Sequence, residues 1–132
     1  MDLDIEWRAP IDNAALNALH AEGFGTRLFE TDWAAQLDRH SLGWVTAHDD
    51  GRLVGFVNVA WDGGVHAFIL DTLAAAGMRR RGIGRRLIER AVEGARAAGC
   101  EWLHVDWDED HLTAFYVESC GFTPTPAGLI AL

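Results

Sequence analysis

The stretch "RRRGIGRRLIER", residues 79–90, surrounds two glycines with six arginines at the start of an amphipathic pattern. Its formal charge is +5 because Glu89 is its one acid, whereas the 132-residue chain has a net charge of −9. Glycines at a helix start let a ligand approach the free backbone N–H groups, and arginine side chains supply paired donors for phosphate oxygens. The stretch therefore predicts a diphosphate-binding turn. The alternative is a solvated helix face that is rich in arginine.

Two known phosphate-binding motifs do not match this stretch. A P-loop requires Gly-Lys-Ser/Thr, and the chain contains no lysine. A dinucleotide-binding fingerprint requires a third glycine or alanine, where Leu87 stands, and a strand that leads directly into the glycines. Residues 74–81 separate the preceding strand from Gly82, so this interpretation fails, although Asp106 occupies a position like that of the ribose-binding acid.

Size and composition predict one soluble domain, with 49% hydrophobic and 23% charged residues. No apolar run is long enough to cross a bilayer, and the start "MDLDIEW" lacks the basic and apolar regions of a signal peptide. We therefore expect a cytoplasmic protein with no membrane partner. The acidic balance disfavours nucleic acid as a partner. Cys100 and Cys120 are expected to be buried free thiols.

Hydrophobic periodicity and turn residues predict an α/β protein with a mixed sheet. Asp12 or Asn13 is expected to cap the first helix, and Thr31 or Asp32 the second. A strand, a long helix and a strand in the second half predict a right-handed crossover, with helices on both sheet faces. The expected strands are residues 5–10, 43–48, 53–61, 65–74, 100–107 and 128–132, and the expected helices are residues 12–24, 30–41, 82–99 and 108–119.

Two segments carry a resemblance to a known family. Residues 79–84, Arg-Arg-Arg-Gly-Ile-Gly, resemble the Gln/Arg-x-x-Gly-x-Gly/Ala signature of the GNAT acyl-CoA N-acyltransferases. "HLTAFYVESCGF", residues 111–122, resembles the later A-x-x-F-Y-x-x-x-G-F segment of that family, at a separation that one helix and one strand fill. The resemblance implies a single GNAT-like domain over residues 1–132. Its expected fold is a mixed, mostly antiparallel sheet in βααβββαβαβ order.

The resemblance implies acetyl-CoA as co-substrate and no metal. In the family, the cofactor pyrophosphate lies on the backbone amides of the glycine turn, and the pantetheine arm pairs with the end of the preceding strand. Arg79 occupies the first position of the signature. The implied cofactor-binding residues are Thr72, Leu73, Ala74, Arg79, Arg80, Arg81, Gly82, Ile83, Gly84 and Arg85.

The resemblance also implies acetyl transfer to a primary amine of a small molecule or peptide by direct nucleophilic attack. Tyr116 lies where the family keeps its general acid. A phenol of pKa near 10 stays neutral and can protonate a departing thiolate, whose reference pKa is about 8.5. The alternative for Tyr116 is a half-buried aromatic residue on an amphipathic helix. The alternative for the protein is a non-catalytic acyl-CoA-binding or sensor domain.

The general base and the acceptor are less defined by the sequence. Asp71 is the preferred base, while His104, Asp106 and Asp108 are alternatives that share one face of an expected strand. These three and His111 could also converge on a metal, which acyl transfer does not require. The acidic remainder of the chain favours a cationic acceptor. Edge strands of this fold can pair in a homodimer.

Overall fold

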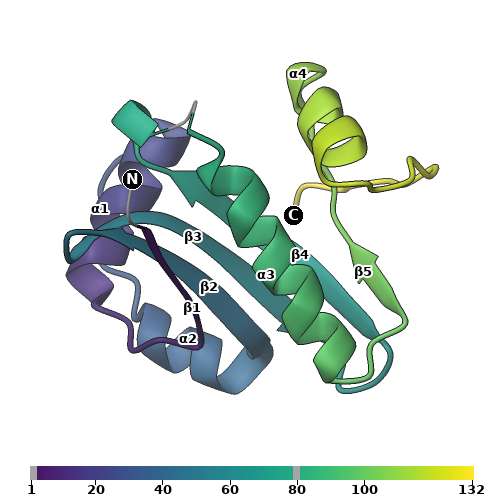
Figure 1. The fold of residues 1–132 in the computed structure, drawn as a ribbon, viewed down its shortest axis with the longest axis horizontal. Helices are drawn as coiled ribbons and strands as arrows, with labels where there is room; N and C mark the ends of the chain where they lie inside the picture. The colour runs from purple at the N-terminus through teal and green to yellow at the C-terminus, as the bar shows by residue number, and fades with distance from the viewer. Residues whose placement is uncertain (1–2, 79–80) are drawn as a thin grey trace.

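The computed structural model describes residues 3–78 and 81–132, which form one five-stranded sheet in the order β1-β2-β3-β4-β5 (Figure 1). Strands β1 to β4 are antiparallel neighbours, and β5 runs parallel to β4. The strands are β1 (Leu3–Trp7), β2 (Ser41–Asp49), β3 (Arg52–Trp61), β4 (His66–Ala74) and β5 (Trp102–His104). The expected mixed, mostly antiparallel sheet is confirmed.

Helices cover both faces of this sheet. The helices α1 (Asn13–Phe24) and α2 (Trp33–His40) lie on one face, and α3 (Ile83–Ala97) crosses the other (Figure 1). The side chain of Asp12 accepts a hydrogen bond from the Ala15 amide and caps α1, and Asp32 caps α2 in the same way. These caps satisfy first-turn amides, so each helix begins where the sequence predicted a polar cap.

The hydrophobic core lies between the sheet and these three helices. The apolar side of α3 supplies side chains that are fully buried, as its helical spacing predicted. Strands β2 and β3 are buried along most of their length because helices cover both of their faces. The largest side chains with no more than 1% exposure are Phe56, Leu16, Leu37, Ile83, Leu87, Ile88, Val45, Val54, Val57 and Val59.

The C-terminal part departs from the sequence prediction. Strand β5 pairs with β4 at three positions and ends at His104, so the expected strand over residues 100–107 is too long. The strand predicted at residues 128–132 is wrong, because residues 120–132 form no helix or strand. Pro124 and Pro126 precede it and have no amide to donate, which disfavours pairing with β5.

The helix predicted over residues 108–119 is divided in two. A short α-helix, α4 (His111–Thr113), continues directly into a π-helical segment, η2 (Ala114–Ser119). The amide of Cys120 donates to the carbonyl oxygen of Phe115 at 3.0 Å, five residues back, which is the π-helical spacing. None of the helices in the described part of the chain is long and apolar enough to span a membrane.

Candidate active site

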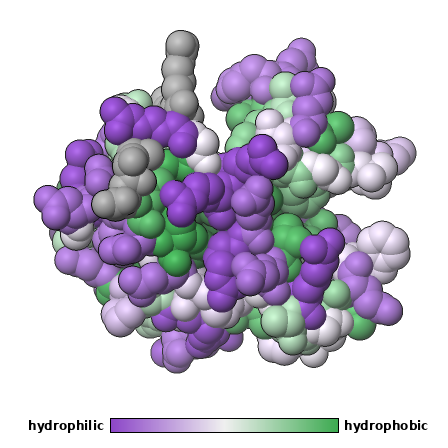
Figure 2. All heavy atoms as spheres, in the orientation of Figure 1, coloured by the Kyte–Doolittle hydropathy of each residue, from purple (hydrophilic) through white to green (hydrophobic). Residues whose placement is uncertain are grey.

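Strands β4 and β5 separate and open a cleft in the sheet. Their last paired residues are Phe68 and His104, after which β4 continues to Ala74 without a partner on that edge (Figure 1). The chain after β5 turns away into α4 and η2. These form a lobe, and indentations of the surface separate it from the rest of the molecule (Figure 2). The cleft has a volume of about 200 Å³. Its lining residues are Gly23, Thr72, Leu73, Ala74, Gly84, Leu112 and Phe115.

The turn before α3 presents backbone N–H groups beside this cleft. Gly82 has φ +74°, a conformation that side chains strongly disfavour, and α3 begins at the next residue. Among the described residues, no side chain caps the N-terminus of α3. The first-turn amides of a helix point outward along its axis, which is the orientation that suits an anion. The amide of Arg81 instead donates to the carbonyl oxygen of Met78 at 3.2 Å and closes the turn. Arg79 and Arg80 lie outside the described residues.

The second glycine of the motif has a packing role. A Cβ added at Gly84 would lie 3.0 Å from Cζ of Phe115, so glycine lets α3 and η2 approach closely. Arg85 and Arg90 have partners within the fold. Arg85 forms an exposed ion pair with Glu89 at 2.9 Å, and the guanidinium of Arg90 lies 5.3 Å from the ring centre of Trp7. The arginine-rich stretch thus combines a helix start without a side-chain cap, among the described residues, with ordinary surface contacts.

Tyr116 joins η2 to β4 at the edge of the cleft. It is 6% exposed and is the only buried residue between Arg96 and Leu132. Its ring stacks on Trp107, with 5.2 Å between ring centres, and its hydroxyl donates to Oγ1 of Thr72 at 3.3 Å. Burial raises the pKa of the Tyr116 phenol, and the hydrogen bond to Thr72 partly opposes this rise. The hydroxyl is therefore neutral and keeps its proton at physiological pH.

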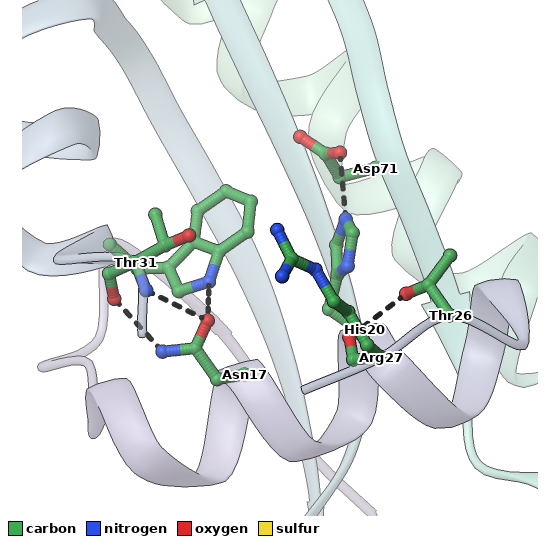
Figure 3. Close-up of polar contacts among 7 residues, drawn as sticks. Asn17, His20, Thr26, Arg27, Thr31 and Asp71 are labelled. Atoms are coloured by element: carbon green, nitrogen blue, oxygen red, sulfur yellow. Dashed lines mark hydrogen bonds and ion pairs between the residues drawn. The ribbon is translucent and has the colours of Figure 1, made fainter. Parts of the chain in front are cut away.

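Asp71 lies on a bulge of β4 and points toward α1. Its φ is +55°, and β4 has one extra residue between its pairings with Phe56 and Asn58. Oδ1 of Asp71 lies 3.6 Å from Nε2 of His20, with both side chains about a quarter exposed (Figure 3). Burial raises the pKa of the Asp71 carboxyl, while the charge of His20 and a hydrogen bond from Asn58 act against it. The two side chains form an ion pair when His20 is protonated.

Sequence reasoning missed two α1 residues that contact the site. His20 packs against Trp33, with 5.5 Å between ring centres, and meets Asp71 only because α1 crosses β4. A carboxylate oxygen of Glu22 accepts a hydrogen bond from the Ala76 amide at 2.7 Å and ties α1 to the turn after β4. A lone histidine and a lone glutamate in a helix give no sequence signal for either contact.

The other proposed bases lie on β5 or in the loop that follows it. His104 stacks on Phe68, with 4.7 Å between ring centres, on the exposed face of β5. The expectation that it shares a strand face with Asp106 and Asp108 is wrong, because β5 ends at His104 and the two aspartates follow in an exposed loop. His111 pairs with Glu109 at 3.2 Å instead. The described residues contain no group of three or more side chains arranged to hold a metal ion.

Comparison with known proteins identifies the family. The model of the Acetyltransferase (GNAT) family matches residues 6–122, and the chain belongs to this family. A search of curated protein sequences gives no significant match.

Solved structures share the fold over almost the whole chain. An acetyltransferase from Trypanosoma brucei is 20% identical, with a TM-score of 0.81 and coverage of 98% of this chain and 99% of the other. A GNAT family acetyltransferase from Streptococcus pneumoniae TIGR4 is 19% identical, with a TM-score of 0.80 and coverage of 99% and 98%. The aminoglycoside N-acetyltransferase AAC(6')-Iy, solved in complex with CoA, is 18% identical, with a TM-score of 0.75 and coverage of 99% and 94%. The expected family and fold are confirmed.

Proposed function

We propose that residues 1–132 form a single N-acetyltransferase domain that moves the acetyl group of acetyl-CoA to a primary amine of a small molecule or peptide. The observation that carries this proposal is the convergence of β4, the start of α3 and η2 on one cleft. The likeness in fold to an N-acetyltransferase solved with CoA supports acetyl-CoA as the co-substrate. Family membership supports acetyl transfer as the reaction.

The residues around the cleft fit the parts of coenzyme A. The first-turn amides of α3, at Ile83, Gly84 and Arg85, have no side-chain cap among the described residues and suit a diphosphate. The edge of β4 from Thr72 to Ala74 has no strand partner on the side of β5, so its main chain can pair with the amide groups of an extended arm. The α3 amides and the β4 edge would thus bind coenzyme A at two places through main-chain groups.

Bound acetyl-CoA would supply the acetyl group as a thioester, so that a C–N bond forms to the amine, the C–S bond breaks, the amine loses a proton and the sulfur gains one. Tyr116 supplies the proton for the sulfur from its hydroxyl and recovers a proton from water. Its raised pKa keeps the hydroxyl neutral beforehand. Its hydrogen bond to Thr72 fixes the oxygen at the β4 edge, next to the proposed path of the thioester arm.

The pair of Asp71 and His20 removes the proton of the amine. An amine of reference pKa near 10.4 is protonated at neutral pH and must lose a proton before it attacks. Asp71 accepts this proton, directly or through water, and His20 at 3.6 Å can take it onward to solvent. Asp71 precedes Thr72 in β4 and Tyr116 donates to the side chain of Thr72, so the proposed base and the proposed acid both adjoin this residue.

The test is thiol release from acetyl-CoA with a panel of amines, comparing wild type with Tyr116→Phe. We expect this substitution to lower the rate by about 100-fold or more, with acetyl-CoA binding and the melting temperature preserved. Ser119→Ala is the matched control, because it removes an exposed hydroxyl from the same segment, η2. An unchanged rate in Tyr116→Phe contradicts the acid role. Binding without turnover of any amine would instead indicate an acyl-CoA sensor.

A further inference from the structure

The segment between α1 and α2, residues 25–32, runs back along α1. The amide of Thr26 donates to the carbonyl oxygen of Ala21 at 3.1 Å. Further along, the amide of Thr31 donates to Oδ1 of Asn17 at 3.3 Å, and Nδ2 of Asn17 donates to the Thr31 carbonyl oxygen at 2.9 Å. These contacts hold the segment beside the turn of α1 that carries His20, as Figure 3 shows.

Arg27 lies in this segment, directly after the contact with Ala21. Its side chain extends back along α1 on the side that carries His20 and faces Asp71 (Figure 3). The guanidinium lies 4.7 Å from the ring centre of Phe29, which holds it in place by a cation–π contact. An exposed guanidinium beside the proposed acceptor site can offer its paired N–H donors to a ligand.

None of the ion pairs found among the described residues involves Arg27. This is notable in a chain with 20 acidic and 11 basic residues, where carboxylates are abundant. The segment around Arg27 carries exposed apolar side chains, with Leu28 at 66% and Phe29 at 39%. An exposed guanidinium without a carboxylate partner keeps its paired N–H donors available for a ligand.

We infer that the acceptor carries an anionic group, a carboxylate or a phosphate, in addition to its amine, and that Arg27 binds this group. The inference rests on the proposed function. Asp71 and His20 would receive the amine, and Arg27, on the same side of α1, would receive the anion in a paired hydrogen bond. Such an acceptor has charges of both signs, whereas the acidic composition of the whole chain favours a purely cationic one.

The experiment measures kcat/KM for pairs of acceptors that differ only in the anionic group. One pair is an amino acid and its carboxamide, and the other is an amino sugar phosphate and the free amino sugar, so the two pairs distinguish a carboxylate from a phosphate. We expect wild type to prefer the anionic member of one pair by about 10- to 100-fold, the range for hydrogen bonds to charged groups. The preference should shrink in high salt because the charges are exposed.

Variants then assign the preference to Arg27. Arg27→Gln should remove it by lowering kcat/KM for the anionic acceptor alone, and Arg27→Lys should keep part of it, since lysine retains the charge but not the paired donors. Arg39→Gln is the control, because Arg39 is an exposed arginine in the last turn of α2. Equal use of both members of each pair, or an equal loss for both in Arg27→Gln, overturns this inference and leaves the proposed function intact. Bound acetyl-CoA with no amine acetylated overturns both.

Discussion

Two regions of the molecule differ in how deeply their side chains are buried. Strands β1 to β4 and helices α1 to α3 enclose a continuous core of residues that are almost completely buried. From Arg96 to Leu132, by contrast, Tyr116 is the only buried residue, and its neighbours Trp107 and Phe122 are only partly covered. The first region therefore supplies stability and the second supplies one wall of the cleft. Segments with few buried contacts open at low free-energy cost, so ligand binding should act mainly on the second region.

The largest expected effect comes from a pair of truncations, one in each region. Phe56→Ala should lower the free energy of unfolding by about 3–5 kcal/mol, because Phe56 is 0% exposed and its removal leaves a cavity. Leu112→Ala should lower it by only about 1 kcal/mol, since the side chain is partly buried, yet weaken acetyl-CoA binding because Leu112 lines the cleft. Urea unfolding measures the free energy of unfolding of each variant, and ligand titration measures its affinity for acetyl-CoA. Equal losses of stability would mean that the C-terminal region belongs to the core.

A smaller effect is expected where the two regions touch. Gly84→Ala places a methyl group 3.0 Å from Cζ of Phe115 and should push η2 away from α3, which changes the shape of the cleft that both residues line. We expect acetyl-CoA affinity to fall about tenfold, equivalent to about 1.4 kcal/mol, while the melting temperature changes little. Gly77→Ala is the matched control, because a Cβ at Gly77 meets no atom within 4 Å. Similar affinity in both variants would show that the contact between α3 and η2 does not shape the site.

The smallest effect concerns the pH dependence of stability at the bulge of β4. Burial raises the pKa of Asp71 in the folded state above its unfolded value of about 3.9. Its contribution to the free energy of unfolding is therefore fully present below pH 3.9 and is lost as the pH rises through the folded pKa. Asp71→Asn should match wild type at low pH and exceed it at pH 7 by less than about 1 kcal/mol. Urea unfolding at several pH values measures this, and a variant that is less stable than wild type at pH 7 contradicts it.

The sequence predicted the parts of the site that depend on local spacing. The glycine turn, the amphipathic α3 and the segment around Tyr116 each have a pattern within one or two helical turns, and the structure places all three at the cleft. The predictions failed where pairing depends on a distant partner. A strand over residues 128–132 has suitable residues, but β5 offers only three residues beside it.

Short-range pattern by itself predicted the alternation of strands and helices and the turn of Gly82 and Gly84, because both depend on backbone geometry and neighbouring side chains, while the family came from the resemblance of two motifs to a known signature. Only the tertiary structure decided that His20 meets Asp71 and that Arg27 lies along the same side of α1. Those contacts form when α1 and the segment after it pack across β4, so no spacing in the sequence encodes them. The physical reason is that a functional site built between elements is set by how their surfaces fit, and this fit is a property of the folded chain as a whole.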